Sequence, residues 1–334
     1  MTDSRAPRWQ LITAFAAVYL IWGSTYLAIR FAIETLPPFF MAATRFLVAG
    51  ALLYGFARWR GAESPTRRNW LAAALLGSLF LLLGNGGVVW AEQVVPSGLA
   101  ALLVAVVPMW TVLIDWVRPG GRRPGATTVA GLAIGFAGVA FLIAPGDLVG
   151  GAGVNLVGAV VLMGATLAWS IGTVYSSRLP LPASPLLATG MEMLAGGAGL
   201  AVAGLLAGEA ARVDLAGASL RSVGSLAYLI VFGSLVGFTA FVWLLRVTTP
   251  ARVATYAYVN PVVAVVLGWA LAGEPLTART LVAAAGIVAA VVLIVSERSR
   301  AVPAKPGTEP APVRSSRRPR FAPSGRNGRS RPAA

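Results

Sequence analysis

Ten apolar stretches recur along the chain, each close to the roughly 20 residues that an α-helix needs to cross the hydrocarbon core of a bilayer. Hydrophobic residues make up 57% of the 334 residues and charged residues only 12%, about half the charged share of a typical soluble domain. The pattern predicts an all-α polytopic membrane protein. The predicted spans are residues 11–31, 38–57, 70–90, 95–117, 128–144, 154–175, 185–207, 223–245, 251–271 and 280–296.

The charges between these spans alternate along the chain. The loops after the even-numbered spans are basic: Arg58, Arg60, Arg67, Arg68, Arg118, Arg122, Arg123, Arg178 and Arg246. The intervening loops carry Glu34, Glu92, Asp147 and Glu274, and the loop between the seventh and eighth spans is mixed. Because cytoplasmic loops are rich in Lys and Arg, both termini are predicted to be cytoplasmic. The first apolar run is too long for a signal peptide and is interpreted as the first span.

Five spans in each half imply an inverted repeat, because the second half must begin on the opposite side of the membrane. Four domains follow: a cytoplasmic N-terminus over residues 1–10, repeats over residues 11–145 and 154–296, and a tail over residues 297–334. An offset that aligns the second span with the seventh also pairs residues of like type or opposite charge. These pairs are Trp22 with Trp169, Arg45 with Glu192, and Gly50 with Gly197. As a separate match outside this offset, Gly77-Ser78 in the third span corresponds to Gly233-Ser234 in the eighth.

Glu192 lies midway along an apolar run that carries no other charge. A bare carboxylate at this depth is costly, so it is expected to face a partner, a cavity or a transport path. The alignment places Arg45 at matching depth, which makes a salt bridge between the two one interpretation. The other is functional: Glu192 binds a coupling proton or a substrate ammonium, and Arg45 binds a substrate carboxylate.

Several further residues are candidates for the substrate pathway. Trp22 and Trp169 lie well inside their spans, where they either line a cavity or pack against neighbouring helices. Tyr256 and Asn260 share a face of the ninth span, and Pro261 frees a backbone carbonyl in the same turn. Asn85 either lines the pathway or makes an interhelical hydrogen bond. The pathway is thus predicted to include Trp22, Ser24, Arg45, Asn85, Trp169, Glu192, Tyr256 and Asn260.

The chain contains no cysteine and no histidine, which removes disulfides, thiolate chemistry and the most common general base. It contains no sequence typical of a nucleotide-binding loop. No cofactor, metal site or enzymatic activity is expected, although a channel, a non-transporting subunit and a lipid-modifying membrane enzyme are alternatives. The net charge is +15, with ten basic residues after Ser296. This tail is expected to be disordered and to contact anionic lipid headgroups rather than nucleic acid.

Several motifs together resemble one transporter family, the EamA family of the drug/metabolite transporter superfamily. They are Trp22-Gly-Ser-Thr-Tyr26, Gly84-Asn-Gly86, Val95-Pro-Ser-Gly-Leu-Ala-Ala101, Tyr256-Ala-Tyr-Val-Asn-Pro261, Ser170, Tyr175 and Gly273-Glu-Pro275. The resemblance covers residues 10 to 296. It implies two inverted five-helix repeats in a bacterial inner membrane and export of small metabolites, such as amino acids, amphipathic compounds or drugs. Both a monomer and a homodimer stay open as the functional unit.

Overall fold

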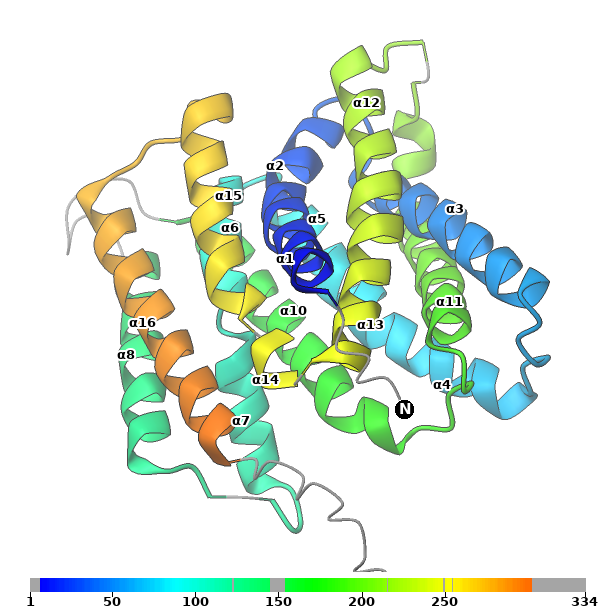
Figure 1. Ribbon diagram of the computed structural model, residues 1–334. Coiled ribbons are helices and arrows are strands. Elements are labelled where there is room, and N and C mark those ends of the chain that lie inside the picture. Colours follow the sequence, from blue (N-terminus) through cyan, green and yellow to red (C-terminus); the bar gives the residue numbers. More distant parts are fainter. Residues whose placement is uncertain are drawn as a thin grey trace, which may run out of the picture. The chain divides into compact units, whose positions relative to one another are not determined.

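The computed structural model describes residues 7–121, 123–144, 154–214, 216–248, 250–253 and 255–301 (Figure 1). Within these ranges the regular structure is helical. The helices of the first half are α1 (Arg8–Ala16), η1 (Ala17–Ile21), α2 (Trp22–Ala32), α3 (Pro38–Trp59), α4 (Arg67–Gly77), η2 (Ser78–Asn85), α5 (Gly86–Ala91), α6 (Ser97–Val104), α7 (Val107–Val117) and α8 (Ala126–Ile143). Those of the second half are α10 (Leu156–Tyr175), η3 (Ser176–Arg178), α11 (Pro185–Leu206), η4 (Glu209–Arg212), α12 (Leu220–Tyr228), η5 (Leu229–Val236), α13 (Gly237–Val247), α14 (Pro250–Val253), α15 (Tyr256–Ala272) and α16 (Ala278–Ala301).

These helices join into the spans that the apolar pattern predicts. In the described part of the chain, nine continuous helical stretches are long and apolar enough to cross a membrane, and Tyr256–Ala272 is a shorter apolar helix of 17 residues. The predicted ten-helix membrane fold is therefore confirmed. The ninth span begins later than predicted because residues Pro250–Val253 form a separate short helix. The expected disordered tail lies outside the described residues from position 302 onward.

Local sequence signals set several helix starts. Thr66 and Asn69 form a capping box at the start of α4, in which each side chain accepts a hydrogen bond from the backbone N–H of the other. Ser184 and Ser219 accept hydrogen bonds from backbone N–H groups three residues later, at the starts of α11 and α12. Serine, threonine and asparagine are favoured at these positions because they satisfy N–H groups that have no partner inside the helix.

Helices α3 and α11 cross in close contact and lie side by side at the right of Figure 1. A Cβ atom on Gly50 would lie 2.9 Å from the backbone nitrogen of Leu194, and one on Gly190 would lie 2.8 Å from that of Tyr54. Near the other end of the contact, a Cβ atom on Gly197 would lie 3.1 Å from the backbone nitrogen of Leu47. The two helices are therefore antiparallel, and glycine is required because the backbones touch.

This antiparallel contact shows that the expectation of matching depth for Arg45 and Glu192 was wrong. Because Gly50 faces Leu194 and Gly190 faces Tyr54, each charged residue lies on its own helix's N-terminal side of the crossing. The two helices run in opposite directions, so these sides point to opposite membrane faces. On α3, the position that faces Glu192 lies seven residues beyond Arg45. This separation corresponds to about 10 Å along the helix axis. Equivalent positions in an inverted repeat are related by rotation and do not share one depth.

The first helix of each half packs against the third and fourth spans of the other half. Helix α2 contacts α12, η5 and α15, and helix α10 contacts η2, α5, α6 and α7. The third and eighth spans each contain an eight-residue π-helical segment, η2 and η5, where these contacts occur. Wide π-helical turns expose backbone carbonyls and are frequent at functional sites. Both η2 and η5 therefore take part in the contacts between halves, beside the closer contact of α3 with α11.

Candidate functional site

Trp22 is enclosed by aromatic rings of the second half. Its indole N–H donates a hydrogen bond to the backbone carbonyl of Gly233 in η5 (3.1 Å). The ring centroids of Phe238, Phe241 and Tyr256 lie 5.3, 5.1 and 5.3 Å from that of Trp22, with Phe238 and Tyr256 edge-on. Edge-on aromatic contacts are favourable beyond the area they bury. Trp22 therefore ties the start of α2 to the eighth and ninth spans.

Arg45 approaches the same segment from α3. Its side chain is 4% exposed, and its Nε–H donates to the hydroxyl of Ser234 (3.0 Å). The guanidinium carbon lies 4.7 Å from the ring centroid of Phe46, and a Cβ atom on Gly233 would lie 3.0 Å from its Nη2 atom. Arg45 forms no ion pair with any acidic residue that the structure describes. The structure thus buries a guanidinium at the contact between halves and leaves its charge without a carboxylate.

Two predicted residues of the ninth span lie beside Trp22. Tyr256 provides the edge-on ring described above, and Asn260 is buried one turn further along α15. With its amide nitrogen facing the first span, Asn260 donates to the backbone carbonyls of Tyr19 (3.1 Å) and Tyr256 (3.3 Å). Tyr19 also shares a short hydrogen bond with the hydroxyl of Thr255. Asn260 therefore joins the first and ninth spans next to the aromatic cluster.

Ser24 contacts the eighth span at Tyr228, the residue directly before the π-helical segment. Its hydroxyl donates to the carbonyl of Ile21 (2.8 Å) and lies 2.6 Å from the hydroxyl of Tyr228. The Tyr228 ring in turn stacks on Phe232, with centroids 5.2 Å apart. Ser24, Trp22, Arg45, Tyr256 and Asn260 thus all reach the interface that α2 forms with η5 and α15. We call Trp22, Arg45, Gly233, Ser234 and Tyr256 the η5 site.

Trp169 and Asn85 form a smaller counterpart at η2. The Trp169 ring lies 5.0 Å from that of Phe80, and a Cβ atom on Gly84 would lie 3.0 Å from the indole. The adjacent Asn85 has a buried side-chain oxygen that finds no hydrogen-bond partner in the described part of the chain. The interhelical hydrogen bond considered for Asn85 is therefore not made through this oxygen. Trp169 occupies the position that Trp22 has in the other half.

Glu192 stands apart from the η5 site. It is partly buried on α11, and it pairs with no basic residue in the described ranges. Its backbone carbonyl lies against α4, where a Cβ atom on Gly77 would be 2.5 Å away. The salt bridge with Arg45 that the sequence suggested is not formed, because the guanidinium is bound to Ser234 on the other side of the helix crossing.

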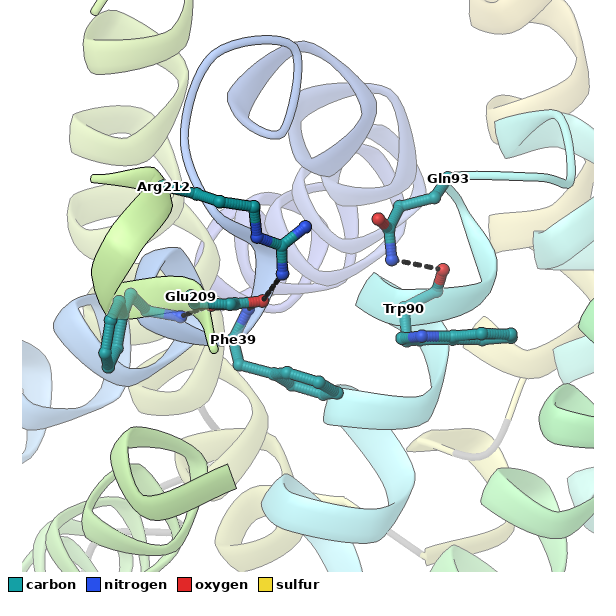
Figure 2. Close-up of polar contacts among 6 residues, drawn as sticks. Phe39, Trp90, Gln93, Glu209 and Arg212 are labelled. Carbon is teal, nitrogen blue, oxygen red and sulfur yellow. Dashed lines mark hydrogen bonds and ion pairs between the residues drawn. The ribbon is translucent and has the colours of Figure 1, made fainter. Parts of the chain in front are cut away.

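Two acidic residues that the sequence analysis placed only in loops, Glu209 and Glu274, accept hydrogen bonds at the starts of helices in the first half. Glu209 is 1% exposed and accepts hydrogen bonds from the backbone N–H groups of Phe39 (3.1 Å) and Phe40 (2.9 Å), and it lies 3.8 Å from Arg212 (Figure 2). Figure 2 also shows the Gln93 amide donating to the carbonyl of Trp90 (3.0 Å) at the end of the third span.

Glu274 holds the fourth span in the same way. Its carboxylate accepts hydrogen bonds from the backbone N–H of Ser97 (2.7 Å), the Ser97 hydroxyl (2.8 Å) and the N–H of Gly98 (2.9 Å). We call these contacts of Glu209 and Glu274 the two carboxylate caps. Each cap satisfies free N–H groups after a proline and meets the positive end of a helix dipole. The prolines before α3 and α6 signal these helix starts in the sequence. Nothing in the sequence identifies the distant carboxylates that cap them.

Comparison with known proteins agrees with this architecture. The model of the EamA-like transporter family matches residues 9–144 and again residues 156–296. The Escherichia coli K12 protein named "Uncharacterized inner membrane transporter YedA" is 43% identical over 301 residues, covering 90% of this chain and 95% of its own. The Bacillus subtilis "Uncharacterized transporter YvbV" is 25% identical over 292 residues, covering 86% and 92%.

A solved crystal structure matches with a TM-score of 0.57 at 20% identity, covering 89% of this chain and all of its own, and thus has the same fold. The family matches cover most of the chain, and the Escherichia coli relative is an inner membrane transporter. The protein is accordingly a multi-pass membrane transporter of the inner membrane. Its two matched halves, its apolar helices and its similarity to these relatives show that the chain belongs to the EamA-like transporter family.

Proposed function

We propose that the protein is a secondary transporter that exports a small amphipathic metabolite bearing a carboxylate, such as an amino acid, by alternating access. The single observation that carries this proposal is the η5 site, where Arg45 presents a buried positive charge with no acidic partner among the described residues. A guanidinium binds a carboxylate through two parallel hydrogen bonds, and a site shielded from water strengthens that attraction.

The aromatic cluster around Trp22, which contacts Gly233 as Arg45 does, supplies the second element of recognition. Trp22, Phe241 and Tyr256 present apolar faces and edges within one cluster. Such a surface favours an apolar or aromatic group on the substrate. A substrate with a carboxylate at one end and an apolar group at the other would contact both elements.

The arrangement of the halves supports movement between two states. Trp22 and Arg45 belong to the first half, whereas Gly233 and Ser234 belong to the second, so the site changes when one half moves against the other. In transporters built from inverted repeats, the substrate site lies between the repeats, and alternating access is largely a rocking of one repeat against the other. The chain is proposed to do no covalent chemistry on its substrate.

We propose that proton antiport drives the export, with Glu192 as a proton-binding group. The carboxylate is the one acidic side chain within α11, and it has no basic partner in the part of the chain that the structure describes. An intramembrane acid of this kind is typical of proton relays in transporters. The basic loops support an orientation with both termini in the cytoplasm.

Transport by the purified full-length protein in liposomes tests this function. A panel of radiolabelled amino acids and organic amines is presented outside, and uptake is measured with and without unlabelled compound inside. Saturable uptake that is accelerated by the unlabelled compound supports a carrier. Conductance that rises linearly with voltage in planar bilayers, without saturable uptake, would show a channel instead.

A further inference from the structure

Glu92 is a fully buried acid that the η5 site does not use. It directly follows the third span, which ends at Ala91, and its side chain is 0% exposed. Neither of its carboxylate oxygens has a hydrogen-bond partner among the residues that the structure describes. An ionised carboxylate is very unfavourable when it is removed from water without compensating hydrogen bonds, and a buried group of this kind takes up a proton instead.

The nearest basic group does not neutralise this carboxylate. Arg30 of α2 donates its Nη1–H to the backbone carbonyl of Glu92 (2.8 Å), and no ion pair joins the two side chains. Tyr26, also on α2, is close enough to interact electrostatically with Glu92. The guanidinium thus holds the end of the third span in place while the acid is left without a direct counter-ion.

A second acid, from the other half, interacts electrostatically with Glu92. Glu274 comes from the segment between α15 and α16, and it forms one of the two carboxylate caps on α6. Burial raises the pKa of the Glu92 carboxyl well above its usual range, the neighbouring Glu274 raises it further, and Arg30 lowers it. Three accepted hydrogen bonds suit a negative charge on Glu274, whereas Glu92 has none to support a second one.

We propose that Glu92 binds a proton in this conformation and releases it to water when the contact between the ends of α2, α5 and α6 and the Glu274 cap opens. This inference rests on the proposed transport function and adds a proton site distinct from Glu192. Glu92 passes from carboxylic acid to carboxylate, and the proton leaves to the aqueous phase on that side of the membrane. Opening would admit water, which stabilises the carboxylate. The proton affinity of Glu92 would therefore differ between the closed and open conformations.

The location of Glu92 fits a role in closing one end of the transport route. The Glu209 and Glu274 caps tie segments of the second half to the starts of α3 and α6. A negative charge on Glu92 would repel Glu274 and weaken the cap that it forms. A proton on Glu92 removes that repulsion, so the closed arrangement and the protonated acid stabilise each other.

The first test is labelling by dicyclohexylcarbodiimide, which adds to protonated carboxyl groups in apolar surroundings. Purified full-length protein is treated across pH 5 to 9, and modified peptides are identified by mass spectrometry. Glu92 is expected to react at pH 6 and to lose reactivity as the pH rises through its raised pKa, whereas the exposed Glu63 stays unreacted. Absence of a Glu92 adduct at pH 6, with Glu192 modified in the same sample, would overturn the proposal.

Two matched variants test the role of Glu274. Glu274→Gln removes a like charge, so the loss of Glu92 labelling should move to lower pH by about one unit. Glu209→Gln makes the same change at the other carboxylate cap and should leave the Glu92 profile where it is. Equal shifts in both variants, or none in either, would contradict the proposed interaction between Glu92 and Glu274.

Thermal unfolding gives a readout that needs neither reagent nor substrate. A carboxyl whose folded-state pKa lies above its unfolded value, about 4.3, contributes stability that is present below that value and is lost as the pH rises through the folded pKa. The Tm of the wild-type protein should therefore fall relative to Glu92→Gln between pH 5 and 9. A Tm difference that is constant across this range would overturn the proposal.

Transport separates this proposal from the function on which it rests. In liposomes with an imposed pH gradient, Glu92→Gln should lose the acceleration of amino-acid flux that the wild-type protein shows. An undiminished response to the gradient would remove Glu92 from coupling. If wild-type protein transports none of the probes, the proposed function fails, whereas the labelling and Tm results still decide whether Glu92 binds a proton.

Discussion

Arg45 and Ser234, 189 positions apart in the sequence, are joined by a hydrogen bond of 3.0 Å between the guanidinium Nε and the serine hydroxyl. This contact connects the second span of one half to the π-helical segment of the other. It holds the arginine side chain in place at the contact between the halves, and the ligand role of the guanidinium is our proposal. The predictions below begin from this pair.

Replacing Arg45 should weaken substrate recognition without unfolding the protein. Arg45→Lys keeps the positive charge but loses the planar fork, so apparent affinity for a carboxylate substrate should fall about 10- to 100-fold. Arg60→Gln changes an exposed arginine at the end of the same helix and serves as the control. Saturable uptake in liposomes is the measurement, and equal kinetics for Arg45→Lys and wild type would contradict the assignment.

The close contact of α3 with α11 should be sensitive to a single methyl group. Gly50→Ala places a Cβ atom 2.9 Å from the backbone of Leu194, and such overpacking costs about 1–3 kcal/mol. Gly55→Ala on the same helix meets no atom within 4 Å and should be neutral or slightly stabilising. Thermal unfolding in detergent compares the two, and similar Tm values would show that the crossing is looser than described.

Crowding the start of α13, directly after the π-helical segment, should disturb Trp22. A Cβ atom on Gly237 would lie 2.4 Å from the indole nitrogen of Trp22, whereas Gly224 in the same span has open space. Gly237→Ala should therefore shift tryptophan fluorescence and raise the apparent KM for substrate, with Gly224→Ala as the matched control. Unchanged fluorescence and kinetics in Gly237→Ala would separate Trp22 from the substrate pathway.

Removing the Glu209 cap should destabilise the start of α3. Glu209→Ala leaves the N–H groups of Phe39 and Phe40 without their acceptor, a loss of about 1–3 kcal/mol for buried donors. Glu63→Ala alters an exposed acid and should have little effect. Amide hydrogen exchange of residues 38–42 reports the change locally, and equal protection in both variants would contradict the capping role.

Glu192 is predicted to be necessary for proton-driven transport. Glu192→Gln cannot be ionised, so the response of flux to an imposed pH gradient should disappear. The control is Glu63→Gln, whose side chain is exposed. Flux in Glu192→Gln that still follows the pH gradient would reject coupling through this residue.

Much of the fold could be predicted because span length and loop charge are local properties. Apolar stretches of about 20 residues define membrane helices whatever their neighbours are, and the span ends agree with the structure to within a few residues. Trp22, Tyr256 and Asn260 were identified through motifs on the first and ninth spans, and the structure brings them together. Their grouping reflects the packing of the first span against the ninth, which no local pattern specifies.

The relation of Arg45 to Glu192 shows where the sequence alone was insufficient. Alignment of the halves identified equivalent positions but not the antiparallel crossing that separates them in depth. Glu92, Glu209 and Glu274 similarly read as loop charges, and only folding made the first a buried acid without a partner and the others caps on distant helices.

The amino-acid sequence by itself thus determined the membrane class, the number of spans and their pairing into halves, because hydrophobic length and charge act residue by residue along the chain. The tertiary structure alone decided which charges are satisfied, since hydrogen-bond partners such as Ser234 for Arg45 come from segments that only packing brings within 3.0 Å. Burial and partner availability are properties of the assembled helices, and they control where a guanidinium or a carboxyl group can bind a ligand or a proton.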